Sequence, residues 1–490
     1  MMLSAEHAIL AALLVPLLGV AGILLLRRSP NLREGVTLLI SLILMLIVLG
    51  LLPAVLAGEQ PELTLLSMLP GLDIAFKVEP LGMIFAGVAA ILWPVASLYS
   101  IGYMRGNHEK HQTRFYVFFA IAIAAAMGIA FAANLVTLFI FYEVLTLSTY
   151  PLVTHKGNED ALQAGRVYLG ILLSTSVGLF LPAIIWVWHV TGTTEFTAGG
   201  VIGDQLSGPL LTVLAFMFIY GIGKAAVMPM QRWLPAAMVA PTPVSALLHA
   251  VAVVKAGVFS VIKVVVYILG VDTLRSAPDI EWLLYAAGFT VLVASIIALQ
   301  QDNLKRRLAY STISQLSYVV LGAMILAPIS VAGAALHVVA HAFGKITLFF
   351  AAGSIYTAAH KTKVSELDGI GHRMPWTMGA FTIGALSMIG VPPAVGFISK
   401  WYILMGAFQA EQMVAVAVIV ISTLLNAAYF VPIIYAAFFK AENPRDELTH
   451  GEAPLPIVLA LSLTALATLL LFLFPEVPYQ LAQLIGVAKP

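Results

Sequence analysis

Apolar stretches, each separated from the next by a short polar connection, follow one another along almost the whole chain. A helix needs roughly 20 mostly apolar residues to cross the hydrocarbon layer of a membrane. The pattern therefore predicts an all-α, polytopic integral membrane protein with about 14 transmembrane helices in a single membrane domain over residues 1–490. The predicted helices begin near Ser4, Gly35, Val78, Phe115, Asn134, Gly165, Gly208, Thr242, Trp282, Leu308, Ser330, Trp376, Gln412 and Pro454.

Two of these helices contain residues that interrupt helical hydrogen bonding. Gly221 and Gly223 precede Pro229 in the seventh helix, and the run Gly390–Gly396 contains two prolines in the twelfth. Broken helices at membrane depth usually line a cavity or an ion site, because only there are their free backbone groups satisfied. The seventh and twelfth helices are therefore predicted to be broken.

The composition supports a membrane protein and excludes other classes. Hydrophobic residues make up 61% of the chain and charged residues 10%, whereas soluble domains carry about 25% charged residues. A formal net charge of +1 argues against nucleic acid as a partner, since phosphate recognition needs a concentrated basic face. The chain has no cysteine, which excludes thiolate-held iron–sulfur clusters. Another chain would have to carry electrons, and no cofactor is predicted.

The distribution of basic residues predicts the orientation in the membrane. The first apolar run is followed by Arg27 and Arg28 without a small-residue cleavage site, so it is predicted to be a helix rather than a signal peptide. Seventeen lysines and arginines fall in loops that follow odd-numbered helices, but only Lys77 and Arg275 fall in the others, and Lys489 is in the tail. Because basic loops stay in the cytoplasm, both termini are predicted on the outer face of a bacterial inner membrane.

Six charged side chains remain inside the predicted helices. An ionised group at the bilayer centre is disfavoured by at least ~2.5–3.5 kcal/mol, so it must be paired, neutral or in contact with water. Lys263 lies nearer a helix end and is expected to extend to the membrane surface. The six residues are Glu143, Lys224, Lys255, Lys263, Lys345 and Lys400.

Histidines accompany these charges. His337, His341 and Lys345 are spaced i, i+4 and i+8, which places them in one stripe along the eleventh helix, and His249 lies six residues before Lys255. An inward stripe of titratable groups is what a proton relay needs. The alternative is that the buried charges only hold helices together. His108 and His111 lie in a basic, solvated loop, so no metal site is predicted.

A carboxylate that approaches and leaves a lysine changes the proton affinity of that lysine. Glu143 and Lys224 are both expected near the middle of the membrane, on the fifth and seventh helices. These two residues are predicted to form a switchable pair.

Four segments resemble the antiporter-like membrane subunits of respiratory complex I and of Mrp-type multisubunit Na⁺/H⁺ antiporters. They are Lys224–Gly257, Leu308–Tyr318, His341–Lys345 and Gly390–Trp401. The resemblance extends over about residues 75–440 and implies a fourteen-helix core with two inverted five-helix repeats, here 115–267 and 282–439.

The resemblance also implies which residues translocate protons. The family's glutamate on the fifth helix and its lysines on the seventh, eighth and twelfth correspond to Glu143, Lys224, Lys255 and Lys400. The unfavourable burial of charge points to these four independently, along with Lys345 and the histidines.

Within this family the chain is most similar to the D-type component of Mrp antiporters. Lys400 and the residue pattern of 314–318 favour the D-type component, and the chain stops about sixteen residues after the last predicted helix. The implied partners are the large A-type component and the small B-, C-, E-, F- and G-type components of such a complex, with H⁺ and Na⁺ or K⁺ as transported ions. A proton-pumping subunit of complex I or of a membrane-bound hydrogenase is the alternative.

Overall fold

Helices form nearly all of the regular structure in the computed structural model, which describes residues 4–69, 72–441 and 451–486. Arg445 and Lys489, both part of the charge count, lie outside the described residues. Eleven described segments are long and apolar enough to cross a membrane. They are α1 (Ala5–Leu25), α2 (Pro30–Leu56), α3 (Pro80–Gly106), α4 (Gln112–Ala130), α5 (Leu135–Val153), α6 with α7 (Glu159–Thr175 and Leu181–Thr191), α10 with α11 (Thr242–Ala246 and Val253–Val264), α13 (Glu281–Gln300), α15 (Pro328–Ala359), α18 (Met413–Phe439) and α19 (Leu455–Leu473).

The other three predicted spans are also helical, and each departs from a simple apolar helix. The predicted start of every span lies within six residues of an observed helix start. One of the three is a polar helix and two are broken, as predicted. They are α14 (Leu304–Met324), α8 (Pro209–Gly221) followed by α9 (Trp233–Ala236), and α16 (Pro375–Ile389) followed by α17 (Gly396–Gln409). Two further α-helices are short, α12 (Val271–Arg275) and α20 (Glu476–Gln483).

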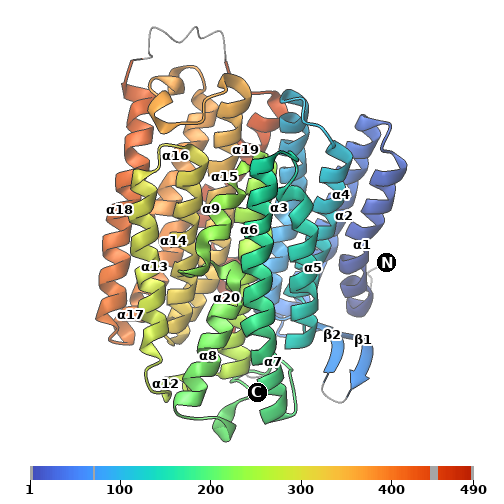
Figure 1. The fold of residues 1–490 in the computed structure, drawn as a ribbon, viewed down its shortest axis with the longest axis vertical. Coiled ribbons are helices and arrows are strands. Elements are labelled where there is room, and N and C mark those ends of the chain that lie inside the picture. Colours follow the sequence, from blue (N-terminus) through green and yellow to red (C-terminus); the bar gives the residue numbers. More distant parts are fainter. Residues whose placement is uncertain (1–3, 70–71, 442–450, 487–490) are drawn as a thin grey trace.

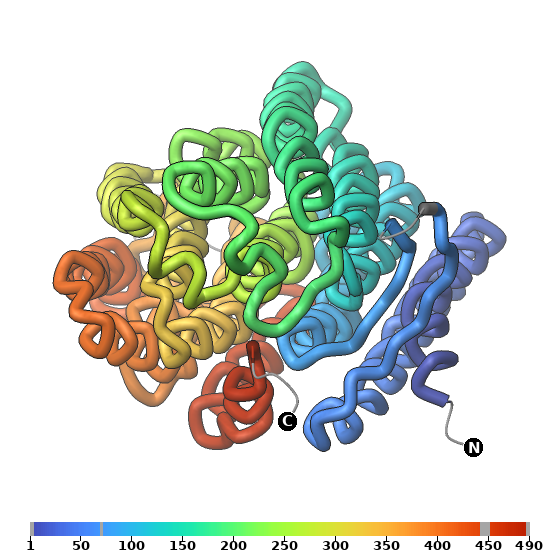
Figure 2. Tube along the Cα trace, turned by 90° about the horizontal axis from the view of Figure 1, so that it is seen from below, coloured from blue at the N-terminus to red at the C-terminus, as the bar shows by residue number. Residues whose placement is uncertain are grey.

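The helices stand roughly side by side in one bundle, with α1 and α18 at opposite edges (Figures 1 and 2). Two segments run through the enclosed interior. Every residue in the most apolar window of Thr242–Leu269 and of α15 is buried, whereas only 28% of that window is buried in the peripheral α2. The outer helices expose large apolar side chains such as Leu46 and Phe439, as expected of surfaces in contact with lipid. The buried lysines and histidines are thus carried mainly by the two interior segments.

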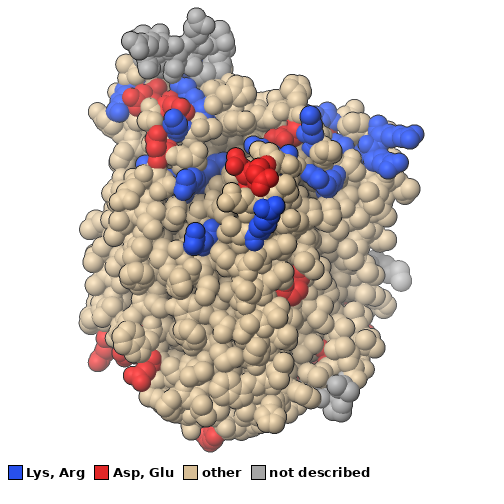
Figure 3. Space-filling model, viewed as in Figure 1, with Lys and Arg blue, Asp and Glu red and all other residues tan. Residues whose placement is uncertain are grey.

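A β-hairpin, which the apolar pattern did not predict, lies between α2 and α3. Its strands β1 (Glu62–Leu69) and β2 (Leu72–Lys77) are antiparallel. Other extended segments continue the backbone pairing beyond β2: Lys77 N donates to Phe131 O at 2.6 Å, and Thr197 N to Tyr267 O at 3.1 Å. This layer covers one end of the bundle, here called the hairpin end. On the face drawn in Figure 3, lysine and arginine gather at the opposite end, here called the basic end.

Glycines position both broken helices. Gly390 ends α16 with φ 88°, a conformation that favours glycine, and Pro392 and Pro393 follow it. In α11, a Cβ on Gly257 would overlap the backbone of Lys224, so glycine allows α11 to approach the break after α8. One broken helix falls in each of the segments 115–267 and 282–439, while the inverted repeat itself stays a prediction.

Candidate functional site

Lys224 lies in the break that follows α8 and is fully buried. Its Nζ donates to Tyr142 O at 2.9 Å and to Thr146 Oγ1 at 2.5 Å, both on α5, and lies 3.1 Å from the centroid of the Tyr142 ring. Its backbone N donates to the Tyr142 hydroxyl at 3.1 Å. An ammonium group surrounded by acceptors and an aromatic face is stabilised without a counter-ion in direct contact.

Glu143 follows Tyr142 on α5, which places it next to the carbonyl that accepts from Lys224. Both carboxylate oxygens are buried and neither has a hydrogen-bond partner among the described residues. The residue as a whole is only partly buried. The two members of the predicted switchable pair are therefore neighbours, but the ammonium group is bound to α5 backbone instead of to the carboxylate. Such an unpartnered carboxylate needs a proton or a cation from elsewhere.

Lys255 on α11 and His341 on α15 share a hydrogen bond between Nζ and Nδ1. Both residues are at most 1% exposed. His341 Nε2 has no partner among the described residues. The contact joins the lysine of the eighth predicted helix to the histidine stripe of the eleventh, which the sequence placed on separate helices.

His337 continues this line toward the twelfth predicted helix. Its ring lies 6.2 Å from that of His341, centroid to centroid. Nε2 shares a hydrogen bond of 3.1 Å with Gln315 Oε1 of α14, and Nδ1 one of 2.8 Å with Ser399 Oγ of α17. Gln315 Nε2 in turn donates to Met388 O, near the end of α16, at 3.3 Å.

Lys400 closes the line at the break between α16 and α17. Its Nζ donates to Met388 O at 2.7 Å and to Ile389 O at 3.1 Å, and lies 4.5 Å from the centroid of the Tyr318 ring. A helix end leaves carbonyl groups without an intrahelical partner, and a cation there also meets the negative end of the helix dipole. The break that Gly390 imposes therefore creates the site that holds Lys400.

Two further predicted residues are buried but lie beside this line. Lys345 Nζ donates to Leu308 O at 3.2 Å, which connects α15 to α14. His249 packs its ring 4.6 Å from that of Phe349, and neither ring nitrogen has a partner among the described residues. No hydrogen bond among the described residues therefore joins His249 to Lys255.

The prediction that Lys263 extends to the membrane surface is wrong. Lys263 is 1% exposed, and its Nζ lies 2.8 Å from Oε1 of Glu79, which is 3% exposed. The layer of extended backbone at the hairpin end covers this part of α11, so the lysine has no surface within reach. Sequence reasoning did not single out Glu79, which lies one residue after the predicted start of the third helix near Val78 and directly before the observed start of α3.

Sequence reasoning also missed the uncharged members of the line, Gln315 and Ser399. Both are fully buried. Asn426 was missed as well, and its Nδ2 donates to Met388 O at 3.3 Å. The available signal was an amide side chain inside an apolar helix, because a buried amide must find hydrogen-bond partners.

Within the described residues, no group of three or more His, Cys, Asp or Glu side chains is arranged to hold a metal ion. The titratable groups instead form a line of hydrogen bonds and ring contacts. The line runs through Lys255, His341, His337, Gln315, the Met388 carbonyl and Lys400. This arrangement brings titratable groups of α11, α15 and α17 into one buried line.

Two solved structures share this fold. A chain of the Mrp complex from Dietzia sp. DQ12-45-1b matches with a TM-score of 0.87 at 20% identity, covering 99% of this chain and 97% of that one. A chain of the membrane-bound sulfane sulfur reductase, an archaeal respiratory membrane complex, matches with a TM-score of 0.86 at 22% identity, covering 98% and 97%.

Sequence comparison assigns the family. Subunit N of the NADH-quinone oxidoreductase of Desulforudis audaxviator (strain MP104C) is 33% identical over 439 residues, which cover 89% of this chain and 87% of that protein. Residues 132–426 match the family described as "NADH:quinone oxidoreductase/Mrp antiporter, TM". The chain therefore belongs to the antiporter-like transmembrane subunits shared by NADH:quinone oxidoreductases and Mrp antiporters.

Proposed function

We propose that this chain is the proton-translocating subunit of a multisubunit monovalent cation/proton antiporter, a secondary transporter in which Na⁺ or K⁺ is exchanged for H⁺. The observation that carries the proposal is the buried line from Lys255 through His341 and His337 to Lys400. Ionisable groups inside a membrane bundle are rare and usually mark an ion or proton path.

Glu143 and Lys224 form the switch at one end of the path. In this structure the Lys224 ammonium group is bound to Tyr142 O and Thr146 Oγ1, and the carboxylate of Glu143 has no described partner. A change of side-chain rotamer that brings the two charges together favours the charged lysine, and separating them favours release of its proton. The lysine's proton affinity then follows the position of the carboxylate.

The other buried groups carry the proton onward. Lys255 receives it, with His249 nearby on the same helix segment, and shares it with His341. His337 continues the path from His341 toward Lys400, while Gln315 and the Met388 carbonyl position His337 and Lys400 at the same helix break. Lys345 lies on the same face of α15 and shifts the electrostatic potential along the stripe.

The same proposal includes the orientation of the chain in the membrane and its partner subunits. Basic residues gather at one end of the bundle, so this end faces the cytoplasm and both termini lie on the outer side of a bacterial inner membrane. The implied partners are a large A-type component and small B-, C-, E-, F- and G-type components of the antiporter complex. A partner packed against α5 would supply the cation that Glu143 lacks among the described residues.

A redox-driven proton pump is the second candidate. The 33% identity with subunit N of an NADH-quinone oxidoreductase favours it. The path through Lys224, Lys255 and Lys400 would be the same, but electron transfer in another chain would drive it, since this chain has no cysteine to hold an iron–sulfur cluster.

Mass spectrometry of the complex purified with this chain in mild detergent separates the two candidates. Small membrane subunits without redox proteins support the antiporter, and the complex in liposomes should then exchange H⁺ for Na⁺ or K⁺ under an imposed gradient. Flavin, iron–sulfur or hydrogenase subunits, together with no cation-dependent proton movement, would replace the antiporter with the pump.

A further inference from the structure

One buried ion pair takes no part in the path described above. Lys263 of α11 and Glu79, the residue before α3, are 1% and 3% exposed, and Nζ lies 2.8 Å from Oε1. Lys263 Nζ also donates to Ala132 O at 2.7 Å and lies 4.4 Å from the centroid of the Phe196 ring. Two other segments of the chain, those of Ala132 and Phe196, therefore also contact the pair.

The position of Lys263 on α11 relates the pair to the line of buried groups that runs from Lys255 to Lys400. Lys255, Phe259 and Lys263 stand at i, i+4 and i+8, so they form one stripe along the helix. Lys255 contacts the histidine stripe of α15, while Lys263 lies two turns nearer the hairpin end, where Glu79 follows strand β2. Lys255 and Lys263 are thus two titratable groups on one interior helix, the first in contact with the histidine stripe and the second nearer the hairpin end.

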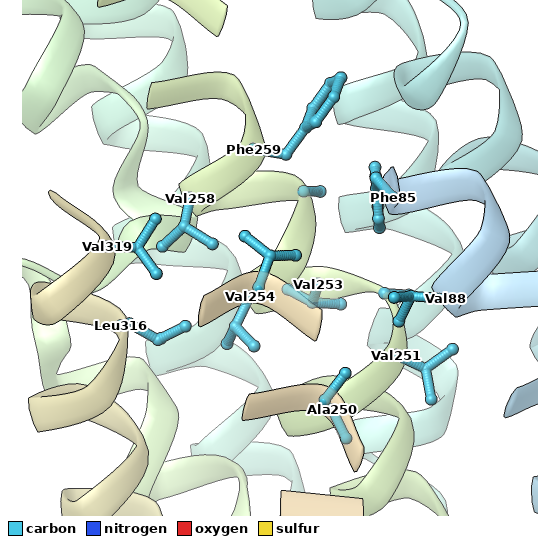
Figure 4. Packing of buried hydrophobic residues seen from close by; sticks show 14 of the residues in the cluster. Phe85, Val88, Ala250, Val251, Val253, Val254, Val258, Phe259, Leu316 and Val319 are labelled. Carbon is cyan, nitrogen blue, oxygen red and sulfur yellow. The ribbon is translucent and has the colours of Figure 1, made fainter. Parts of the chain in front are cut away.

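Apolar side chains separate the two lysines. The Phe259 ring lies 5.3 Å from Lys263 Nζ and 5.1 Å from the Phe85 ring, centroid to centroid in the second case. Figure 4 shows Phe85 and Phe259 among the buried valines of α11, including Val258. A hydrophobic constriction of this kind excludes water until its side chains move.

The far side of the pair lies close to solvent. Lys77, two residues before Glu79, has a side chain that is 26% exposed and is paired at 2.8 Å with Glu62, which is 63% exposed. Glu79 is thus the last enclosed carboxylate before the polar surface of the hairpin end.

Stability is a weak reason for this arrangement. Removing two charges from water offsets most of the attraction between them, and an apolar pair of similar size is often as stable. We propose that Glu79 and Lys263 form a proton-transfer station between Lys255 and the water at the hairpin end, with Phe259 and Phe85 as the apolar barrier on its inner side. This inference rests on the proposed function, because it extends the same proton path.

The transfer needs no further reactant. The Lys263 ammonium group gives a proton to the Glu79 carboxylate, which breaks an N–H bond, forms an O–H bond and leaves both groups neutral. Glu79 then releases the proton to water at the hairpin end. Lys263 takes a new proton from Lys255 when Phe259 moves aside, which restores the ion pair and leaves Lys255 ready to be reprotonated.

Lys263→Arg in the purified complex tests the station. Arginine keeps the ion pair and the charge but does not release its proton, because its guanidinium group stays protonated in proteins. We expect a complex with wild-type subunit composition and thermal stability in which proton transport in liposomes falls to the level of Lys224→Ala. Lys77→Arg is the matched control, since it alters a surface ion pair at the same end and should transport normally.

Failure of this inference and failure of the proposed function give different results. If Lys263→Arg transports at the wild-type rate while Lys224→Ala is inactive, the Glu79–Lys263 pair is only structural, and the proposed function stands. If Lys224→Ala also transports normally, the proposed path fails and this inference fails with it.

A double variant covers the case in which arginine prevents assembly. Glu79→Gln/Lys263→Gln leaves two neutral amides that are able to hydrogen-bond to each other, so it removes titration without leaving an unpaired buried charge. Loss of transport by an assembled double variant supports the station, and wild-type transport overturns it. Phe259→Ala should raise passive proton leak through the complex, and an unchanged leak would exclude Phe259 as the barrier.

Discussion

Lys255 and His341, eighty-six residues apart in the sequence, share a hydrogen bond inside the membrane bundle. If protons pass between them, the two side chains act as one unit, and effects of residues that act as a unit are not additive. We expect Lys255→Ala and His341→Ala each to lower the transport rate by about a hundredfold. The double variant should be no slower than the slower single one.

The transport rates of the two single variants and of the double variant are measured in proteoliposomes that report internal pH. Ser260→Ala is a suitable control, because Ser260 is on the same helix but its hydroxyl donates only to Ala256 O, at 2.7 Å. Multiplied losses in the double variant would show that the two residues act on separate steps.

Lys224→Ala removes the ammonium group that α5 holds through Tyr142 O and Thr146 Oγ1. Transport should fall by about a hundredfold or more, because the group that takes up and releases the proton is lost. Assembly should be intact, since alanine leaves no unpaired charge at position 224. Pull-down of the partner subunits together with transport in liposomes checks both points, and full activity of the variant would contradict the proposed role.

Lys400→Met tests the helix break between α16 and α17. The variant removes the donor to Met388 O and Ile389 O, and the second of these carbonyls then has no described side-chain donor. A buried acceptor without a partner costs about 1–3 kcal/mol, so the thermal unfolding midpoint should fall. Trp401→Phe, at an adjacent side chain that is 49% exposed, should leave the midpoint unchanged.

Gly257→Ala tests the close approach of α11 to Lys224. A Cβ at position 257 would overlap the Lys224 backbone, so the segment must shift, and overpacking of this kind destabilises by about 1–3 kcal/mol. Transport should fall together with stability, because Lys224 moves. Gly170→Ala is the matched control: it lies within helix α6 with no other atom within 4 Å of the added Cβ, and it should be neutral or slightly stabilising.

His155, just beyond the end of α5, predicts a dependence of stability on pH. Burial and, to a lesser extent, the neighbouring Arg114 lower the pKa of His155 from 6.5 to about 4. Between these values the unfolded state binds a proton that the folded state does not, so stability falls as the pH falls from 6.5 toward 4. The loss should reach at most about 1.4 kcal/mol per pH unit.

Thermal unfolding of the complex between about pH 7 and pH 4.5 measures this effect. His155→Phe should remove part of the acid-dependent loss, since phenylalanine keeps the ring but does not bind a proton. An identical pH profile in the variant would show that other groups govern the acid sensitivity.

The sequence alone predicted the membrane-spanning helices of this protein and the breaks in the seventh and twelfth of them. A spanning helix satisfies its own backbone hydrogen bonds and needs only a sufficient run of apolar residues, so its existence is a local property. The glycines and prolines near 221–229 and 390–396 are equally local, and both breaks are present. Charged residues such as Lys224 and Lys400 were visible because lysine is unexpected in an apolar run.

Only the tertiary structure decided which of these groups meet. Lys255 contacts His341 and not His249, which is nearer in the sequence. The packing of α11 against α15 sets this partner, and spacing in the sequence does not. Lys263 is paired with Glu79 for the same reason: the extended segments that cover it, 72–77, 131–134 and 194–197, come from three separate connections. Contacts between distant segments depend on packing of the whole bundle, whereas helix formation depends on the local run of residues.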